Sequence, residues 1–261
     1  MTDPEKGTGD ERAAHGSLVT RERFDAVLFD LDGVLTDTAR IHAACWKRMF
    51  DEFLQSRAHT GGGSFVPFDI ERDYLEHVDG KPRVEGVRDF LHSRGIALPE
   101  GSDGAAPEEA SLRGLGNRKD LLVGRTLAAG RVEAFPGSLA WLRWLRERGF
   151  RLAVVSSSHN CRAVLEGAGI LDVFEARVDG DVADSLGLPG KPRPDTFLKA
   201  AGLLGLAPVR CVVVEDALAG VEAGRAGGFG LVIGVARHGD AAALLRAGAD
   251  VVVDDLEELI P

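Results

Sequence analysis

The chain has 261 residues, 44% of them hydrophobic and 28% charged, which is the balance of a globular protein and excludes a fibrous or wholly disordered one. Its formal net charge of −10 disfavours nucleic acid and anionic membranes as partners, because both attract basic surfaces. No apolar run approaches the roughly 18 residues of a spanning helix, and the three cysteines are far apart, as suits a reducing compartment. We therefore expect a cytoplasmic monomer that binds neither nucleic acid nor membrane.

The first 22 residues are polar and show no hydrophobic period, which predicts a disordered leader over residues 1–22. The segment Asp25–Asp30 is short and apolar and ends in acidic residues, as expected of a buried strand that delivers carboxylates to its carboxyl end. A helix is expected next, over Thr38–Phe53. Between residues 39 and 131 the patterns are helical and no β-rich run is convincing, which predicts a small helical domain.

From Pro136 onward, strand and helix patterns alternate along the chain. We expect strands at 151–155, 211–214 and 231–235, and helices at 139–148, 161–168, 195–204 and 217–226. Such alternation predicts a parallel sheet covered by helices on both faces, which is a doubly wound, Rossmann-like α/β core. Residues 23–38 and 132–261 would form this core, with residues 39–131 inserted into it.

Reactive side chains follow the carboxyl ends of predicted strands or lie in the loops between these strands and the next helices. They are Asp30 and Asp32 after the first strand, Ser156, Ser157 and Ser158 after the second, Lys191 in a Gly-Lys-Pro-Arg-Pro segment, and Glu215 and Asp216 after the strand at 211–214. Ligands of parallel sheets bind at the carboxyl ends of the strands, so we expect these groups to form one site.

The residue types in this group suit phosphoryl transfer. A carboxylate can attack phosphorus only where the negative charge of both partners is offset, which requires a hard divalent cation with oxygen ligands. Asp30, Glu215 and Asp216 can supply such oxygens. Ser156 and Lys191 can donate to the charge that spreads over the equatorial oxygens of a transferring phosphoryl group.

Asp32 lies two residues beyond Asp30, where a different backbone conformation can aim its carboxylate at the leaving oxygen, and we assign it to general acid/base catalysis. Taken singly, each motif has a more ordinary explanation. An Asp-x-Asp or Glu-Asp pair is commonly a turn or a cap, a serine triplet is a loop or helix N-cap, and Gly-Lys-Pro is a turn with an exposed lysine. Their occurrence together, at the same end of predicted parallel strands, favours phosphoryl transfer.

Four segments resemble the motifs of the haloacid dehalogenase superfamily, and the resemblance covers most of residues 24–254. These segments are Asp30–Thr38, Val155–Ser156, Lys191–Asp195 and Val214–Gly220. The resemblance implies an aspartyl-phosphate on Asp30, and Mg²⁺ bound by the Asp30 carboxylate, the Asp32 backbone carbonyl and Asp216, with Glu215 alongside. It also implies a helical cap domain after the first strand, where the helical segment is expected independently.

Within the superfamily, the cap and the phosphate loop resemble those of the β-phosphoglucomutase family. Thr38, His42 and Trp46 lie in a segment that resembles the hinge and first cap helix, where the histidine assists the counterpart of Asp32 and the tryptophan lines the sugar pocket. Because His42 and Trp46 are four residues apart, a helix places them on one face. If the resemblance is set aside, the simpler interpretation is that the histidine is an ordinary partly buried residue and that the tryptophan is part of the core.

Basic residues of the cap resemble substrate contacts of the same family. Gly80 and Arg83 lie in a segment like the cap loop whose arginine holds the phosphate distal to the metal, and a bidentate arginine is a natural clamp. Lys119 matches a cap lysine that contacts the sugar, although long basic side chains are usually solvated. The loop at 156–160 resembles the phosphate- and sugar-binding loop, which implicates Ser157, Ser158, His159 and Asn160 in substrate binding.

These features predict a phosphomutase that interconverts β-glucose 1-phosphate and glucose 6-phosphate through β-glucose 1,6-bisphosphate, so the expected partners are a hexose 1-phosphate and a hexose bisphosphate. Two departures leave the exact sugar open: His159 stands where the family has a lysine, and Ala217 where it has a serine. A Mg²⁺-dependent sugar-phosphate phosphatase of the same fold is the alternative. A non-catalytic sugar-phosphate sensor is disfavoured, because both Asp30 and Asp32 are present.

Overall fold

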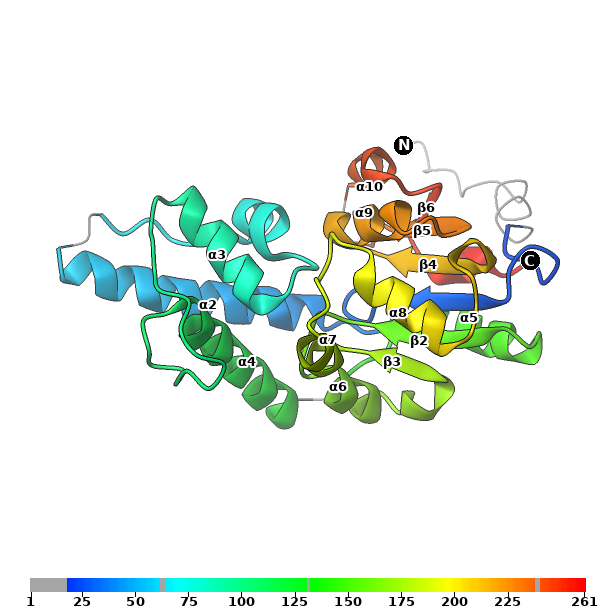
Figure 1. The fold of residues 1–261 in the computed structure, drawn as a ribbon, viewed down its shortest axis with the longest axis horizontal. Coiled ribbons are helices and arrows are strands. Elements are labelled where there is room, and N and C mark those ends of the chain that lie inside the picture. Colours follow the sequence, from blue (N-terminus) through cyan, green and yellow to red (C-terminus); the bar gives the residue numbers. More distant parts are fainter. Residues whose placement is uncertain (1–17, 62–63, 131, 238–239) are drawn as a thin grey trace, which may run out of the picture.

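The computed structural model describes residues 18–61, 64–130, 132–237 and 240–261. Six strands form one sheet in the order β3-β2-β1-β4-β5-β6, and every neighbouring pair is parallel (Figure 1). The strands are β1 (Ala26–Phe29), β2 (Arg151–Val155), β3 (Ala176–Val178), β4 (Cys211–Glu215), β5 (Leu231–Val235) and β6 (Val251–Val253). The predicted doubly wound α/β fold is therefore confirmed.

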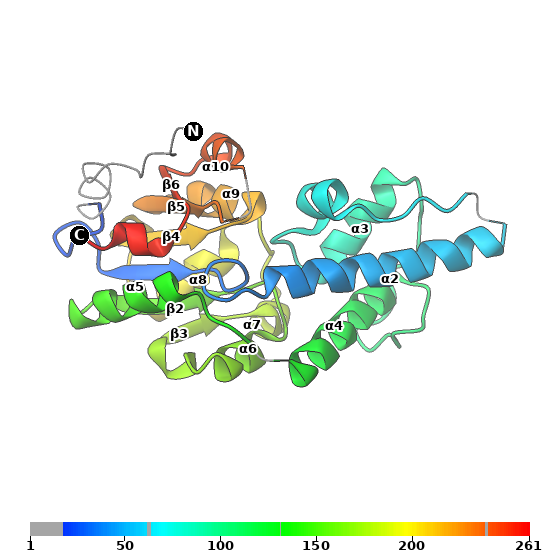
Figure 2. The same ribbon diagram turned by 180° about the vertical axis from the view of Figure 1, so that it is seen from behind.

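Two layers of helices cover the sheet, because alternate strand residues point to opposite faces. On one face, Phe29 of β1 packs edge-on against Trp141 of α5 (Pro136–Glu147), with α6 (Cys161–Gly167) and η4 (Leu256–Leu259) beside it. Leu28 faces the opposite layer, which contains Phe197. That layer consists of α8 (Asp195–Leu203), α9 (Leu218–Ala226) and α10 (Ala241–Ala247). Figure 2 shows α5 in front of the sheet, whereas Figure 1 shows α8 and α9 in front.

The chain leaves the sheet after β1 and returns to it only at α5. Between these elements lie four helices, here called the cap segment: α2 (Ala39–His59), the π-helix η1 (Ile70–Val78), α3 (Arg83–Ser93) and α4 (Leu112–Ala129). They share an aromatic core of their own, in which Phe50 contacts Trp46, Phe68 and Phe90. The cap segment lies beyond the carboxyl ends of the strands (Figures 1 and 2). The exact domain boundaries, near residues 38 and 132, stay a prediction.

The outgoing and returning connections of the cap segment are paired with each other. Thr36 and Ala134 form an antiparallel bridge, and the backbone N–H of Asp37 donates to the carbonyl of Glu133 at 3.0 Å. Leu35 accepts from the N–H of Phe135 at 3.0 Å. The two connections are therefore held side by side beyond the carboxyl end of β1, a central strand of the sheet.

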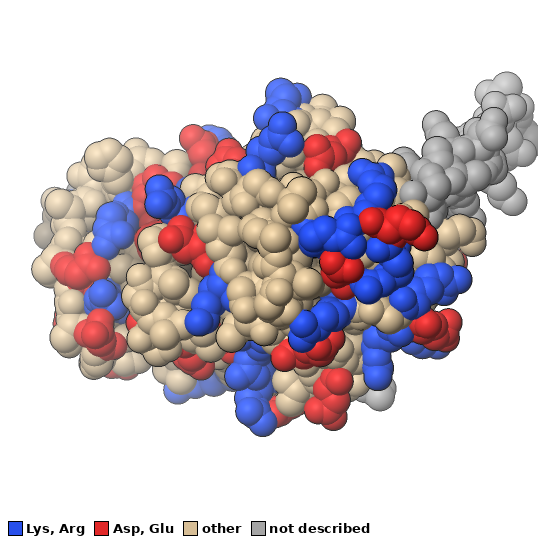
Figure 3. Space-filling model, turned by 45° about the vertical axis from the view of Figure 1, so that its right-hand side comes forward, with Lys and Arg blue, Asp and Glu red and all other residues tan. Residues whose placement is uncertain are grey.

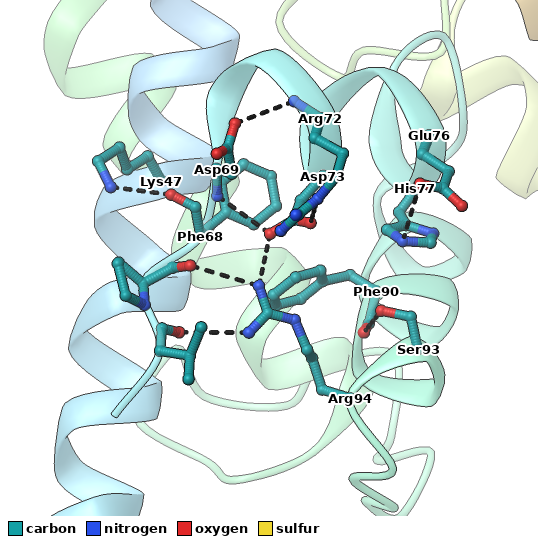
Figure 4. Close-up of polar contacts among 12 residues, drawn as sticks. Lys47, Phe68, Asp69, Arg72, Asp73, Glu76, His77, Phe90, Ser93 and Arg94 are labelled. Atoms are coloured by element: carbon teal, nitrogen blue, oxygen red, sulfur yellow. Dashed lines mark hydrogen bonds and ion pairs between the residues drawn. The ribbon is translucent and has the colours of Figure 1, made fainter. Parts of the chain in front are cut away.

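A buried ion pair fixes η1 to the rest of the cap segment (Figure 4). The guanidinium of Arg94, just after α3, lies 2.5 Å from a carboxylate oxygen of Asp73, and this aspartate also accepts from the backbone N–H of Asp69 at 3.0 Å. Tyr74 donates its backbone N–H to Asp69, and Asp79 donates its own to Tyr74, which are the five-residue steps of a π-helix. The wide turns and the ion pair together set where Tyr74 and Asp79 lie.

The structure adds elements that the sequence pattern does not predict and corrects helix boundaries. The helix expected at 139–148 begins earlier, at Pro136 of α5. The strands β3 and β6 and the helices α7 (Gly180–Leu186) and α10 are additional, and α2 continues to His59, beyond the expected end at Phe53. Of the predicted leader, residues 1–17 lie outside the described ranges. Residues 18–22 form a turn in which Val19 is buried, so they are not part of a disordered leader. In the described ranges, no helix is long and apolar enough to cross a membrane.

Candidate active site

A pocket lies where the cap segment meets the carboxyl ends of β1, β2 and β4. It contains most of the site residues predicted from the sequence, and these are Asp30, Asp32, His42, Trp46, Gly80, Arg83, Lys119, Ser156, Ser157, Ser158, Glu215 and Asp216. Thr38 and Lys191 lie directly behind residues that line the pocket, since they contact Asp32 and Asp30. His159 and Asn160 do not line this pocket. On the face drawn in Figure 3, basic and acidic side chains are interspersed, so local charges in the pocket decide what it binds.

Three carboxylates at the base of the pocket form a group with the chemistry of a magnesium site. One oxygen each from Asp30, Glu215 and Asp216 lies within 4.8 Å of the others. The parallel register pairs Phe29 with Val214, so the residues that follow these two come side by side. A cluster of carboxylate oxygens is the donor set that hard divalent cations prefer, and the residues therefore fit Mg²⁺.

Glycine is required next to this cluster. Gly33 has a φ of 90°, in the left-handed region, and a Cβ at this position would lie 1.9 Å from Oδ2 of Asp216. Any side chain would thus strain the turn and displace a metal-ligand candidate. The Asp-x-Asp-Gly pattern after β1 is explained by this close approach.

Lys191 neutralises part of the negative charge in the cluster. It is only 1% exposed, and its Nζ lies 2.5 Å from Oδ1 of Asp30 and 2.5 Å from Oε1 of Glu215. Burial lowers the pKa of Lys191, but the two facing carboxylates outweigh it, so the pKa lies above its usual value. Burial raises the pKa of Asp30 to about 6 and that of Glu215 to about 7, although the lysine opposes both shifts.

Lys191→Met is expected to lower the free energy of unfolding at pH 8 by about 3–5 kcal/mol, because it leaves two buried carboxylates without their counter-ion. The loss should shrink toward pH 5, since both carboxyls have raised pKa values in the folded state and regain stability as they take up protons. Urea denaturation at the two pH values measures this difference. Lys199→Met is the matched control, because Lys199 lies on α8, the helix that follows Lys191. An equal loss of unfolding free energy in both variants would contradict the pairing of Lys191 with Asp30 and Glu215.

Asp32 is surrounded by hydroxyl groups and an imidazole. Its carboxylate accepts a hydrogen bond from the hydroxyl of Thr38, and the hydroxyl of Ser156 lies 3.4 Å from Oδ2. Nε2 of His42 lies 3.5 Å from Oδ1. Burial raises the pKa of Asp32, while the Thr38 hydrogen bond opposes the shift. A carboxyl group with a raised pKa is suited to carry a proton to or from a substrate oxygen.

His42 connects Asp32 to Lys119 of the cap segment. Nζ of Lys119 lies 2.9 Å from Nδ1 of His42 and 5.1 Å from the centre of the Trp46 ring. Burial, with the nearby lysine second, places the pKa of His42 well below its usual value, so the ring is neutral. Lys119 can only donate, so Nδ1 accepts and the ring proton is on Nε2, facing Asp32. Burial also lowers the pKa of Lys119.

The cap segment touches the serine loop after β2 of the core through Gly80. Its carbonyl accepts a hydrogen bond of 2.7 Å from the hydroxyl of Ser157, and its φ of 70° is in the left-handed region. A Cβ at Gly80 would lie 2.9 Å from Cβ of Ala217. The small side chain at position 217 is therefore part of the contact between the cap and the core.

Arg83 reaches toward the core from the start of α3. Its guanidinium donates to Oδ1 of Asn117 at 3.2 and 3.3 Å and forms an ion pair of 3.3 Å with Asp120. It also contacts the ring of His159. The guanidinium lines the pocket from the cap side, as the sequence predicts, and two polar partners on α4 hold it there.

His159 and Asn160 do not line this pocket. Nδ1 of His159 lies 2.6 Å from Asp181 and Nε2 lies 3.2 Å from Asp184, so the ring faces α7. Asn160 is the N-cap position of α6, and its side chain lies near Gly124 of α4. We expected both in the substrate-binding loop, and the structure places only the serines of that loop in the pocket.

Sequence reasoning missed five residues that line the pocket from the cap side: Tyr74, Val78, Asp79, Lys81 and Asp120. Burial raises the pKa of Asp79 to about 6, with Glu215 raising it further and a hydrogen bond from Tyr74 lowering it. Burial also holds the pKa of Tyr74 well above its usual value. The only available signal for Asp79 was its position directly before Gly80.

Comparison with known proteins agrees with this geometry. A profile of haloacid dehalogenase-like hydrolases matches residues 24–228, and the chain belongs to this family. This confirms the resemblance stated from the sequence motifs.

Among its relatives, a β-phosphoglucomutase from Mycobacterium bovis is 49% identical over 242 residues, which cover 92% of each protein. Hexitol phosphatase A from Escherichia coli is 31% identical over 241 residues, covering 91% of this chain and 94% of that protein. The solved structure of a β-phosphoglucomutase from Clostridium difficile has a TM-score of 0.69 at 26% identity, covering 90% of this chain and 93% of that one. Phosphomutases and phosphatases are thus both found among the relatives of this enzyme.

Proposed function

We propose that the protein is a Mg²⁺-dependent phosphomutase that interconverts β-glucose 1-phosphate and glucose 6-phosphate through β-glucose 1,6-bisphosphate. The observation that carries the proposal is one pocket with two unlike walls. The core wall holds the Asp30 cluster, with Lys191 directly behind it, and this group suits a reacting phosphate. The cap wall holds Arg83, which suits a second one. The 49% identical relative named as a β-phosphoglucomutase supports the same substrate.

In the first half-reaction, the bisphosphate gives a phosphoryl group to the enzyme. A carboxylate oxygen of Asp30 forms a bond to phosphorus while the bond between phosphorus and the sugar oxygen breaks, and Asp32 gives its proton to that oxygen. The second half-reaction reverses these events on the other sugar position, with Asp32 taking the proton of the attacking hydroxyl. His42 and Thr38 hold the Asp32 carboxyl in place throughout.

Charge in the pocket is distributed to suit this transfer. Lys191 and the hydroxyl of Ser156 can donate to the equatorial oxygens of the reacting phosphate. Mg²⁺, when bound by Asp30, Asp216 and the backbone carbonyl of Asp32 with Glu215 alongside, offsets the negative charge of both nucleophile and phosphate. Because the intermediate must turn around between the two transfers, the cap segment has to open and close once for each turnover.

The product of the reaction tests the proposal directly. With β-glucose 1-phosphate, Mg²⁺ and a trace of the bisphosphate, the proposed enzyme forms glucose 6-phosphate, and chelation of Mg²⁺ stops it. NMR of the product mixture distinguishes this sugar phosphate from free glucose and inorganic phosphate. Tests with other hexose 1-phosphates would show which sugar is preferred.

A sugar-phosphate phosphatase is the second candidate, favoured by the 31% identity to hexitol phosphatase A. In that reaction water, rather than a sugar hydroxyl, takes the phosphoryl group from Asp30. The two functions share every core residue and differ in their need for the cap wall. Release of glucose and phosphate as the main products would establish the phosphatase and overturn the mutase. The cytoplasmic location and the monomeric state expected from the sequence stay predictions.

Arg83→Ala is expected to reduce mutase turnover by roughly 10²-fold or more, because a charge-assisted pair with the distal phosphate is lost when the bisphosphate binds. Hydrolysis of a small monophosphate, which has no second phosphate, should fall by less than about threefold. Arg88→Ala, in which an exposed arginine of the same helix loses its pair with Glu100, is the control. Equal losses on both substrates would argue against a distal clamp.

A further inference from the structure

One carboxylate in the pocket comes from the cap segment and has no role in the mechanism above. Asp79 follows η1 and lines the same pocket as Asp30, Glu215 and Asp216, which all come from the sheet. Its neighbour Gly80 lies against Ala217, the residue after Asp216, so closely that a Cβ at position 80 would lie 2.9 Å from the Cβ of Ala217. The cap carboxylate and the metal-ligand candidates are therefore adjacent across the boundary between cap and core.

Asp79 is held in this position by the cap segment itself. The backbone N–H of Asp79 donates to the carbonyl of Tyr74 at 3.0 Å, and the buried Tyr74 side chain lines the same pocket as the Asp79 carboxylate. The ion pair of Asp73 and Arg94 fixes the π-helix that contains Tyr74 and ends directly before Asp79 (Figure 4). The carboxylate consequently moves with the cap as one body and cannot easily swing away from the cluster.

Closure of the cap thus changes the charge at the cluster. In an open form, Asp30, Glu215 and Asp216 face Lys191, and closure adds the carboxylate of Asp79. The cap cations of the same pocket are paired within the cap segment, Lys81 with Asp89 and both Arg83 and Lys119 with Asp120. Like charges that share a partly buried pocket repel, because the protein screens them less than water does. A divalent cation at the cluster reverses the sign of the effect, because it attracts the arriving carboxylate.

We propose that Asp79 is a cap-borne carboxylate that couples cation binding at the Asp30, Glu215 and Asp216 cluster to closure of the cap segment. Bound Mg²⁺ draws the cap shut through Asp79, and the closed form in turn holds Mg²⁺ more tightly, since such coupling is reciprocal. The inference rests on the magnesium part of the proposed function, but it requires neither the mutase nor the phosphatase reaction.

The test measures closure and metal affinity without any substrate. Small-angle X-ray scattering follows the radius of gyration with and without MgCl₂, and titration calorimetry gives the affinity for Mg²⁺. In the wild type, Mg²⁺ is expected to reduce the radius of gyration. Asp79→Asn should already be more closed without metal, should respond less to Mg²⁺, and should bind Mg²⁺ roughly tenfold more weakly. Asp79→Ala should behave in the same way.

Glu71→Gln is the matched control, because this exposed carboxylate of the same π-helix does not line the pocket. It should close and bind Mg²⁺ like the wild type. If both Asp79 variants bind and close like the wild type while the wild type responds to Mg²⁺, the coupling is overturned and the proposed function stands. A wild type that does not bind Mg²⁺ at all overturns both.

Discussion

Asp30→Asn is expected to lower turnover by roughly 10⁵- to 10⁶-fold, the scale on which loss of an enzyme nucleophile acts. An amide has no anionic oxygen to form the bond to phosphorus, and it also removes a ligand from the cluster within 4.8 Å of Glu215 and Asp216. Steady-state formation of glucose 6-phosphate measures the loss. In the wild type, phosphate should be trapped on Asp30 when the reaction is quenched in acid, and mass spectrometry of the digested protein locates it.

The control for Asp30→Asn is Asp254→Asn, in an exposed position after β6. It should retain full activity and full phosphate incorporation. Because the substitution at Asp30 is isosteric, the variant should remain folded, which circular dichroism checks. Substantial activity in a folded Asp30→Asn enzyme, or phosphate trapped on a different residue, would show that the nucleophile is wrongly assigned.

Asp32→Asn is expected to slow the reaction by about 10²- to 10⁴-fold, the usual contribution of general acid/base catalysis. The amide oxygen can still accept the hydrogen bond from Thr38, and the amide NH2 can donate to the hydroxyl oxygen of Ser156, so the geometry of the loop should persist. Its backbone carbonyl is unchanged, and Mg²⁺ affinity should therefore stay within about threefold of the wild type.

The substrate used for Asp32→Asn distinguishes loss of proton transfer from general damage. A phosphate ester with an acidic phenol as leaving group needs no proton from the enzyme, so phosphorylation of Asp30 by it should be nearly normal in the variant. Transfer to or from a sugar hydroxyl should show the full loss. An equal reduction with both leaving groups would mean that Asp32 acts on structure or metal binding instead.

Much of the core was predictable because the physical signals were local. The strands β1, β2, β4 and β5 are four or five residues long and almost entirely buried, so they stand out as short apolar runs between turns. Each places its following polar residues at the same sheet edge. The acidic cluster, Lys191 and the serine loop could be assigned to one site for that reason.

The elements that the sequence did not predict lack such local signals. The strands β3 and β6 have three residues each, which is too short for a period, and β3 is interrupted by Arg177. The helix α7 is polar and is started by a single contact, from the N–H of Val182 to the side chain of Asp179 at 3.0 Å. These elements form through pairing with neighbours already in the sheet rather than through their own composition.

The cap side of the site was harder to predict because a π-helix changes which residues share a face. In η1 the backbone steps are five residues, so a pattern read with the usual helical period does not reveal that Tyr74 and Asp79 meet. His159 shows the reverse problem: its motif suggests a substrate contact, but Asp181 and Asp184 on α7 draw the ring away. The orientation of the His159 ring is therefore set by its tertiary contacts with Asp181 and Asp184, which the local motif does not reveal.

The paired connections at Thr36 and Ala134 have a consequence for how such an enzyme can diversify. Because the entry and exit of the insertion already meet, the sheet would be closed by a short turn if the inserted helices were absent, and their presence adds little loop-closure entropy to the folding of the remainder. Recognition can then change by replacement of the inserted helices, while the core sheet with its acidic cluster keeps its architecture.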